Sequence, residues 1–109
     1  MTVPQSMLPK IFKDQVINLS KKLLNVDKIW LFGSRATGKH HKNSDVDLAF
    51  EFLNGPDACW GEFCSILNDE GKILLPLDLI DFCLAPEGLK ADILKHGVKI
   101  YDKNDNCSL

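Results

Sequence analysis

Apolar residues in the first part of the chain recur at the spacing of a helix. They follow one another at steps of three or four residues: Leu8, Phe12, Val16, Leu19 and Leu23. Lysines and an aspartate stand between them, so one side of such a helix is apolar and the other polar. This pattern predicts an amphipathic helix over residues 8–26, with Pro9 in the first turn, where its missing N–H costs nothing.

Short apolar runs of strand length follow this helix. They cover residues 28–32, 46–52, 77–82 and 98–101, and glycine, proline or asparagine stands near their ends. The run at 77–82, LDLIDF, is almost unbroken in its apolar character, which predicts a strand inside the sheet rather than at its edge.

Two further helices are expected between these strands. The first covers residues 57–70, with Asp57 as its cap and Gly71 as its end, and the second lies between Pro86 and Gly97. Residues 33–44 form a polar connection with room for one helical turn. The order helix, strand, strand, helix, strand, helix, strand predicts a single α/β (α+β) domain over residues 1–109, a small sheet covered by helices.

Composition narrows the class of protein. Hydrophobic residues make up 45% of the 109 residues and the net charge is −2, so we expect no membrane association and no direct binding to nucleic acid. No signal peptide opens the chain, and we expect a cytoplasmic protein. The four cysteines form no C-x-x-C pair, and we assign them no functional role: Cys59, Cys64, Cys83 and Cys107.

Two carboxylates begin the strand at residues 46–52. Because side chains alternate along a strand, Asp45 and Asp47 point to one face while Val46 points to the other. Such a pair repels itself unless a cation lies between its members, and Mg²⁺ takes hard oxygen ligands of this kind. Taken alone, a D-x-D pair is more often a turn residue followed by an exposed strand residue.

A Gly-Ser turn follows the first strand directly. Gly33 lets the backbone approach a ligand closely, and the Ser34 hydroxyl and nearby N–H groups suit phosphate oxygens. Arg35 adds a cation suited to phosphate. Alone, this turn is equally an ordinary tight connection. Together with the aspartates it has the parts that phosphoryl chemistry requires, a phosphate-holding turn and a metal-holding pair.

A third carboxylate is expected from the strand at residues 77–82. Asp78 stands between Leu77 and Leu79, where an unpaired buried charge is costly, and a shared metal ion would compensate it. The alternative is a buried aspartate satisfied by backbone donors. Asp81 lies three residues further on and is expected on the opposite face.

These motifs together resemble the polymerase-β-like nucleotidyltransferase superfamily. Gly33-Ser34, ten intervening residues and Asp45-x-Asp47 match its signature, and the segments LFGSRATG, SDVDLAFE, PLDLIDF and ILKHGVKIYDK are similar to the minimal nucleotidyltransferases (MNT). The resemblance implies a mixed sheet with helices packed on it, use of ATP or another NTP with two Mg²⁺ ions, and transfer of a nucleoside monophosphate. It also implies that Asp45, Asp47 and Asp78 bind metal and act in catalysis, and that Gly33 and Ser34 hold the triphosphate.

The family resemblance also implies a partner. Minimal members pair with an all-helical HEPN protein in a hetero-oligomer, and in some pairs they act as the antitoxin by attaching AMP to a tyrosine of a toxic HEPN RNase. Two alternatives remain at this stage: a non-catalytic module that masks its partner, and transfer to a small molecule or an RNA end. The acidic net charge weighs against transfer to a small molecule or an RNA end.

Overall fold

The chain folds into a mixed sheet flanked by helices. The computed structural model describes residues 8–23, 25–39, 45–53, 59–70 and 76–105. Its helices and strands follow in this order: α1 (Lys10–Leu23), β1 (Val26–Phe32), α2 (Ser34–Thr37), β2 (Val46–Phe52), α3 (Trp60–Glu70), β3 (Leu77–Asp81), the 3₁₀ turn η1 (Phe82–Leu84), α4 (Glu87–His96), β4 (Val98–Asp102) and the 3₁₀ turn η2 (Lys103–Asp105).

The four strands lie in the order β3-β2-β1-β4. The first strand, β1, runs antiparallel to both β2 and β4, whereas β2 and β3 run parallel. The sheet is therefore mixed, as expected from the sequence. β3 and β4 form its two edges, so the prediction that the strand at residues 77–82 lies inside the sheet is wrong. Apolar runs occur on edge strands too, and sequence alone does not report strand order.

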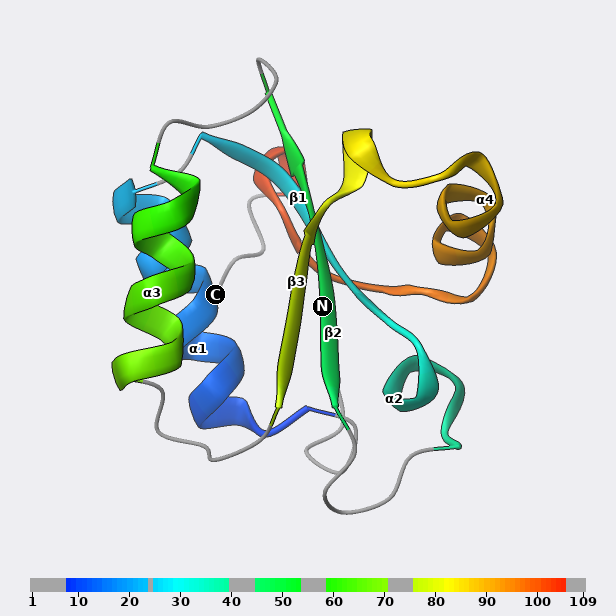
Figure 1. Cartoon of the computed structure of the whole chain (residues 1–109), viewed down its shortest axis with the longest axis horizontal. Helices are drawn as coiled ribbons and strands as arrows, with labels where there is room; N and C mark the ends of the chain where they lie inside the picture. Colours follow the sequence, from blue (N-terminus) through cyan, green and yellow to red (C-terminus); the bar gives the residue numbers. More distant parts are fainter. Residues whose placement is uncertain (1–7, 24, 40–44, 54–58, 71–75, 106–109) are drawn as a thin grey trace.

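The larger part of the core lies between the sheet and helices α1 and α3, which cover one face (Figure 1). Every second residue of β2 points into this core: Val46, Leu48 and Phe50 are fully buried there. The Phe50 ring lies edge-on to Trp60 and Phe63 of α3, with ring centroids 5.0 and 5.2 Å apart. Burying a side chain of this size stabilises the fold by about 1.5–3 kcal/mol.

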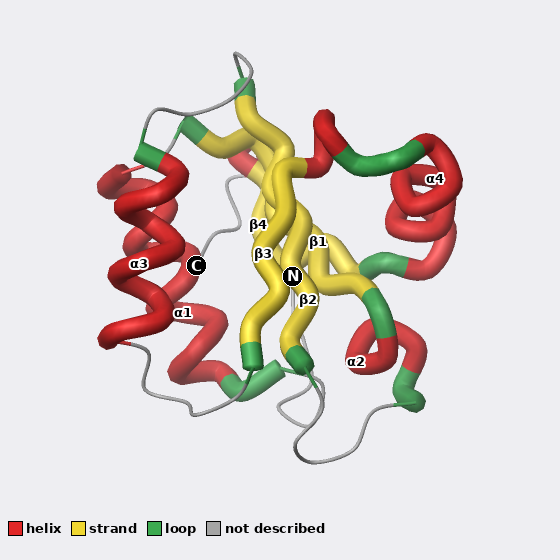
Figure 2. Tube along the Cα trace, viewed as in Figure 1, coloured by secondary structure: helices red, strands yellow, loops and turns green. Residues whose placement is uncertain are grey.

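Helix α4 packs against the opposite face of the sheet (Figure 2). A second, smaller core forms there from Phe32, Ala49 and Ile93, with Ile80 and Leu89 packed against it. The short helix α2 lies beside the end of β1 (Figure 1). This face is covered less completely than the first, because one ten-residue helix stands where α1 and α3 cover the other.

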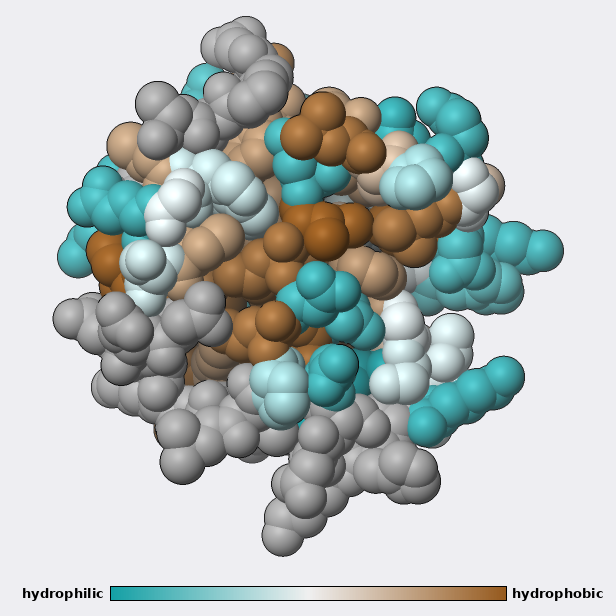
Figure 3. Space-filling model, viewed as in Figure 1, coloured by the Kyte–Doolittle hydropathy of each residue, from teal (hydrophilic) through white to brown (hydrophobic). Residues whose placement is uncertain are grey.

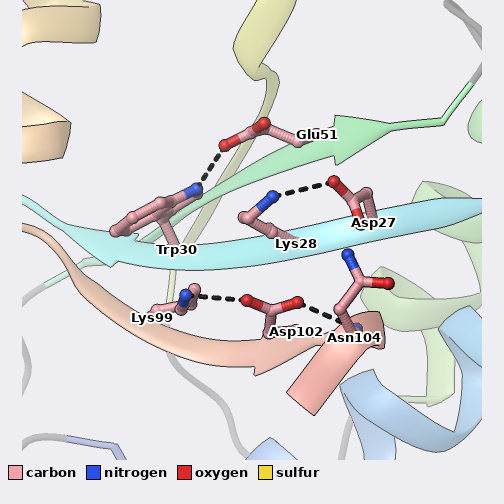
Figure 4. A network of polar contacts seen from close by, with 7 residues as sticks. All are labelled: Asp27, Lys28, Trp30, Glu51, Lys99, Asp102 and Asn104. Atoms are coloured by element: carbon pink, nitrogen blue, oxygen red, sulfur yellow. Dashed lines mark hydrogen bonds and ion pairs between the residues drawn. The ribbon is translucent and has the colours of Figure 1, made fainter.

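Charged and polar side chains occupy the end of the sheet where β1 begins (Figure 4). The Trp30 indole N–H donates to Glu51 at 2.8 Å, and the Lys99 ammonium lies 5.8 Å from the centre of the Trp30 ring. Lys99 in turn pairs with Asp102 at 2.7 Å. Hydrogen bonding to Lys99 is the main reason why the pKa of Asp102 lies below its usual range. These contacts join β1, β2 and β4.

Most predicted elements are present, with shifted ends. The first helix ends at Leu23 rather than at residue 26, because Val26 begins β1 and pairs with Phe52. The 57–70 helix begins at Trp60, and the Asp57 cap falls outside the described residues. Cys59 and Cys64 are partly buried, and Cys83 is exposed. No helix described here has the length and apolar character needed to cross a membrane.

Candidate active site

Asp47 and Asp78 lie side by side on neighbouring strands. They are register partners in the parallel pair of β2 and β3, and partners in such a pair project to the same face of the sheet. Val46 and Leu48 pack on the α1 and α3 face, so Asp47 points to the other face, where Ala49 contacts the α4 core. The two side chains are therefore neighbours on one face of the sheet, and their role in binding metal stays a prediction.

Asp78 is exposed, so the prediction that its charge is buried is wrong. We expected a charge buried within an interior strand, but β3 is the edge strand and its residues are half-buried or exposed. The proximity of Asp78 to Asp47 comes from strand pairing rather than from the need to compensate a buried charge. Asp81 lies three residues after Asp78 in β3, so its side chain points to the opposite face of the sheet. Its carboxylate accepts the Cys83 N–H at 2.9 Å and caps η1.

Gly33 follows the end of β1 and lies against the Asp47 carboxylate. Phe32 is the register partner of Asp47, and Gly33 follows with φ 76°. A Cβ atom at position 33 would overlap the Asp47 carboxylate, with the Asp47 Cγ only 3.2 Å away. A glycine is therefore required here for two reasons: the positive φ, and the space that Asp47 occupies. The sequence predicts only a phosphate-binding role for Gly33 and carries no local signal for this second role.

The turn after Gly33 forms the four-residue helix α2. Ala36 and Thr37 donate their backbone N–H groups to the Gly33 carbonyl at 3.1 and 3.3 Å. Gly38 ends the helix in the left-handed conformation. Ser34 thus lies directly beside the residue that contacts Asp47. Its predicted contact with a triphosphate stays a prediction.

Arg35 is almost entirely buried, with 3% of its surface exposed. We predicted a phosphate contact from its position beside the Gly-Ser turn. A guanidinium with this degree of burial is not displayed on an open surface. The role of Arg35 in nucleotide binding stays a prediction.

The charges of Asp78 and Asp45 act on Asp47. The pKa of Asp47 is raised above its ordinary value, first because the side chain is partly buried, then by the charge of Asp78 and then by that of Asp45. Asp45 is exposed and directly precedes β2. Among the residues that the structure describes, no three His, Cys, Asp or Glu side chains stand close enough to form a ready metal site. The three aspartates are thus neighbours, but they are not a closed ligand cluster.

The donor set nevertheless suits a hard divalent cation. Three carboxylates supply only oxygen ligands, which Mg²⁺ prefers, and their mutual repulsion is what a bound cation relieves. Their position at one end of β2 and β3 leaves them accessible, since Asp45 and Asp78 are exposed and Asp47 is partly so. The residues present therefore fit the ion that the sequence analysis expected.

Comparison with known proteins agrees with this geometry. The polymerase beta nucleotidyltransferase family matches residues 14–106. No curated protein is significantly similar in sequence to this chain.

Several solved structures share the fold. One is a toxin–antitoxin crystal structure with AMP-PNP, whose matching chain is 24% identical, with a TM-score of 0.69 over 86% of this chain and 76% of that one. Another is the tri-AMPylated Shewanella oneidensis HEPN toxin in complex with its MNT antitoxin, with 19% identity and a TM-score of 0.60 over 91% of this chain and 76% of that one.

A third structure extends the likeness to nearly the full length of both chains. A Sulfolobus solfataricus protein described as a nucleotidyltransferase is 18% identical, with a TM-score of 0.57 over 96% of this chain and 95% of that one. The resemblance seen in the sequence is thus confirmed at the level of family and fold. This chain belongs to the polymerase β family of nucleotidyltransferases, with the fold found in toxin–antitoxin complexes of the MNT type.

Proposed function

We propose that this chain is a Mg²⁺-dependent adenylyltransferase that transfers AMP from ATP to a tyrosine of a HEPN-type helical toxin and so acts as its antitoxin. The observation that carries the proposal is the register pair of Asp47 and Asp78, with Gly33 packed against the Asp47 carboxylate. This arrangement puts a phosphate-suited turn and two acidic side chains at one end of the sheet. We further propose that residues 1–109 act as one domain in a cytoplasmic hetero-oligomer with that partner.

In this proposal Asp45, Asp47 and Asp78 hold two Mg²⁺ ions. Bound Mg²⁺ would neutralise charge that develops on the triphosphate during transfer. The protein's part is to present three carboxylates, Asp45 directly before β2, Asp47 in β2 and Asp78 in β3. The pKa of Asp47 is raised mainly by burial, and the charges of Asp78 and Asp45 raise it further, which is consistent with both carboxylates lying near Asp47.

The transfer itself is a displacement at the α-phosphorus of ATP. The tyrosine Oη forms a bond to that phosphorus, the bond to the bridging oxygen of the β-phosphate breaks, and pyrophosphate leaves. Asp78 is placed to position the acceptor hydroxyl and receive its proton, because it is exposed at the sheet edge beside Asp47. Gly33 and Ser34, with Arg35 behind them, would hold the triphosphate.

The solved structures support the choice of nucleotide and partner. The fold occurs in a toxin–antitoxin complex with AMP-PNP, an ATP analogue, and in a complex of an MNT antitoxin with an AMPylated HEPN toxin. These are properties of those proteins. We extend them to this chain because it carries an acidic pair and a glycine turn at one site.

A labelling experiment tests the proposal. The purified chain, its HEPN-type partner, Mg²⁺ and ATP labelled on the α-phosphate should yield labelled partner. The Asp45→Asn/Asp47→Asn variant should not, whereas Asp14→Asn/Asp92→Asn, which removes two exposed carboxylates elsewhere, should label as well as the unchanged chain. Equal labelling by the first variant would contradict the enzyme. If that variant still neutralises the toxin, the chain is a masking module instead.

A further inference from the structure

Strand β3 leaves an apolar surface open at the edge of the sheet. Leu79 packs toward the α1 and α3 core, while Ile80 and Phe82 pack toward the α4 core, and all three remain partly exposed. Leu84 of η1 continues this surface and is 75% exposed, the highest value among the large apolar residues of the described chain. Figure 3 shows the apolar area running up the centre of the view, where Figure 1 places β3, and on toward α4. We call Leu79, Ile80, Phe82 and Leu84 the β3 edge strip.

We infer that the β3 edge strip is the docking surface for the acceptor protein, and that the acceptor segment is apolar with basic residues beside it. The inference rests on the proposed function and specifies which surface recognises its acceptor. The strip is continuous in sequence and strand with Asp78, the carboxylate proposed to meet the acceptor hydroxyl.

Geometry makes contact with the strip unavoidable for a folded protein acceptor. A strand rises about 3.3 Å per residue, so Asp78 lies about 10 Å from Asp81, the last residue of β3, and Phe82 follows directly. Protein interfaces bury about 800 Å² on each partner, a patch wider than that separation. A partner whose hydroxyl reaches Asp78 therefore covers part of β3, and apolar side chains at that place become buried rather than hydrated.

The charge of the segment around the β3 edge strip indicates which kind of partner binds there. The segment from Pro76 to Leu89 carries three carboxylates, Asp78, Asp81 and Glu87, and contains no Lys, Arg or His. Glu87 has a cation nearby, since Lys90 lies 3.6 Å from it, and the Asp81 carboxylate caps η1 on the opposite face, so Asp78 is the carboxylate on the acceptor side whose charge bound Mg²⁺ would partly offset. An acidic, apolar surface repels nucleic acid and anionic membranes and favours a protein segment with basic residues beside apolar ones. Pairing with a second copy of this chain would bring the acidic strips together, which is unfavourable.

Replacing Leu84 with aspartate tests the docking surface. Leu84 is highly exposed, so Leu84→Asp should leave the fold and the affinity for ATP unchanged. Its affinity for the HEPN-type partner should fall by about 10- to 100-fold, the loss expected for a residue at an interface centre. Labelling of the partner at subsaturating concentration should fall by the same factor. Ile11→Asp is the matched control, because Ile11 is 63% exposed on α1, on the other face of the sheet.

Each outcome bears on the inference. An unchanged affinity of Leu84→Asp, or an equal loss in Ile11→Asp, would show that the partner binds elsewhere. A change in the mass of the isolated chain on Leu84→Asp would show that the strip joins copies of this chain, and the inference would again be wrong. If the unchanged chain binds the partner without labelling it, the proposed enzyme fails, while the affinities of the two variants still decide whether the strip is the docking surface.

Discussion

The Asp47 carboxylate occupies the space that a side chain at position 33 would need. Gly33, at φ 76°, ends the strand next to Asp47, and an added Cβ would overlap the carboxylate. The glycine of the turn and the central acidic residue are thus one packed unit. Any substitution at position 33 must move Asp47 or distort the turn, and both changes would disturb a site whose chemistry depends on position.

This contact predicts that Gly33→Ala abolishes most activity. A displacement of about 1 Å can cost about 100-fold in rate, so we expect at least that loss in labelling rate. Gly38→Ala is the comparison, because Gly38 also has a positive φ, 78°, but no atom of the described residues lies within 4 Å of its added Cβ. Gly38→Ala should lose about 1–2 kcal/mol of stability from its left-handed conformation, and Gly33→Ala should lose more, because φ 76° with ψ −154° is a region that only glycine adopts readily. If Gly38→Ala loses as much activity as Gly33→Ala, backbone strain rather than contact with Asp47 is responsible.

Asp47→Asn should stabilise the protein near neutral pH. The folded state raises the pKa of Asp47 above its ordinary value near 3.8, so the charged form is disfavoured by folding and stability falls as pH rises through this range. Removing the charge should add up to about 1 kcal/mol at pH 7, a small value because solvent screens a partly exposed group. Urea unfolding at pH 7 and pH 3.5 measures it, and the gain should shrink at the lower pH. A variant less stable than the unchanged chain at pH 7 would contradict this.

Mg²⁺ should raise the melting temperature of the unchanged chain more than that of Asp45→Asn/Asp47→Asn. A ligand at ten times its Kd stabilises the folded state by about 1.4 kcal/mol, which shifts Tm by several degrees in a domain of this size. Thermal unfolding with and without Mg²⁺, at matched ionic strength, gives the comparison. Asp14→Asn/Asp92→Asn should respond as the unchanged chain does. An equal shift in all three proteins would place the ion elsewhere.

Asp78→Asn should abolish transfer without harming the fold. Asp78 is exposed on an edge strand, so its substitution should change stability by no more than about 0.5 kcal/mol. If it receives the acceptor proton, the labelling rate should fall by about 100-fold or more while ATP still binds. Asp81→Asn is the control in the same strand, because Asp81 caps η1 and lies on the opposite face. A full labelling rate in Asp78→Asn would remove this residue from the proposed mechanism.

Local patterns in the sequence determined most of the helices and strands and the face of the sheet to which Asp47 points. The alternation in VDLAFEF placed Val46, Leu48 and Phe50 in the core and Asp47 on the other face, and the structure has the strand over the expected residues. Helical spacing found α1, and glycine and proline positions found the ends of α4. These signals are local, since each depends only on residues a few positions apart.

Only the tertiary structure decided which side chains meet. Strand order put β3 at the edge and exposed Asp78, and the parallel register with β2 put that residue beside Asp47. Packing at the end of β1 brought Gly33 onto the Asp47 carboxylate and buried Arg35. Strand order, register and burial depend on contacts between segments far apart in the chain, and local periodicity carries no information about them.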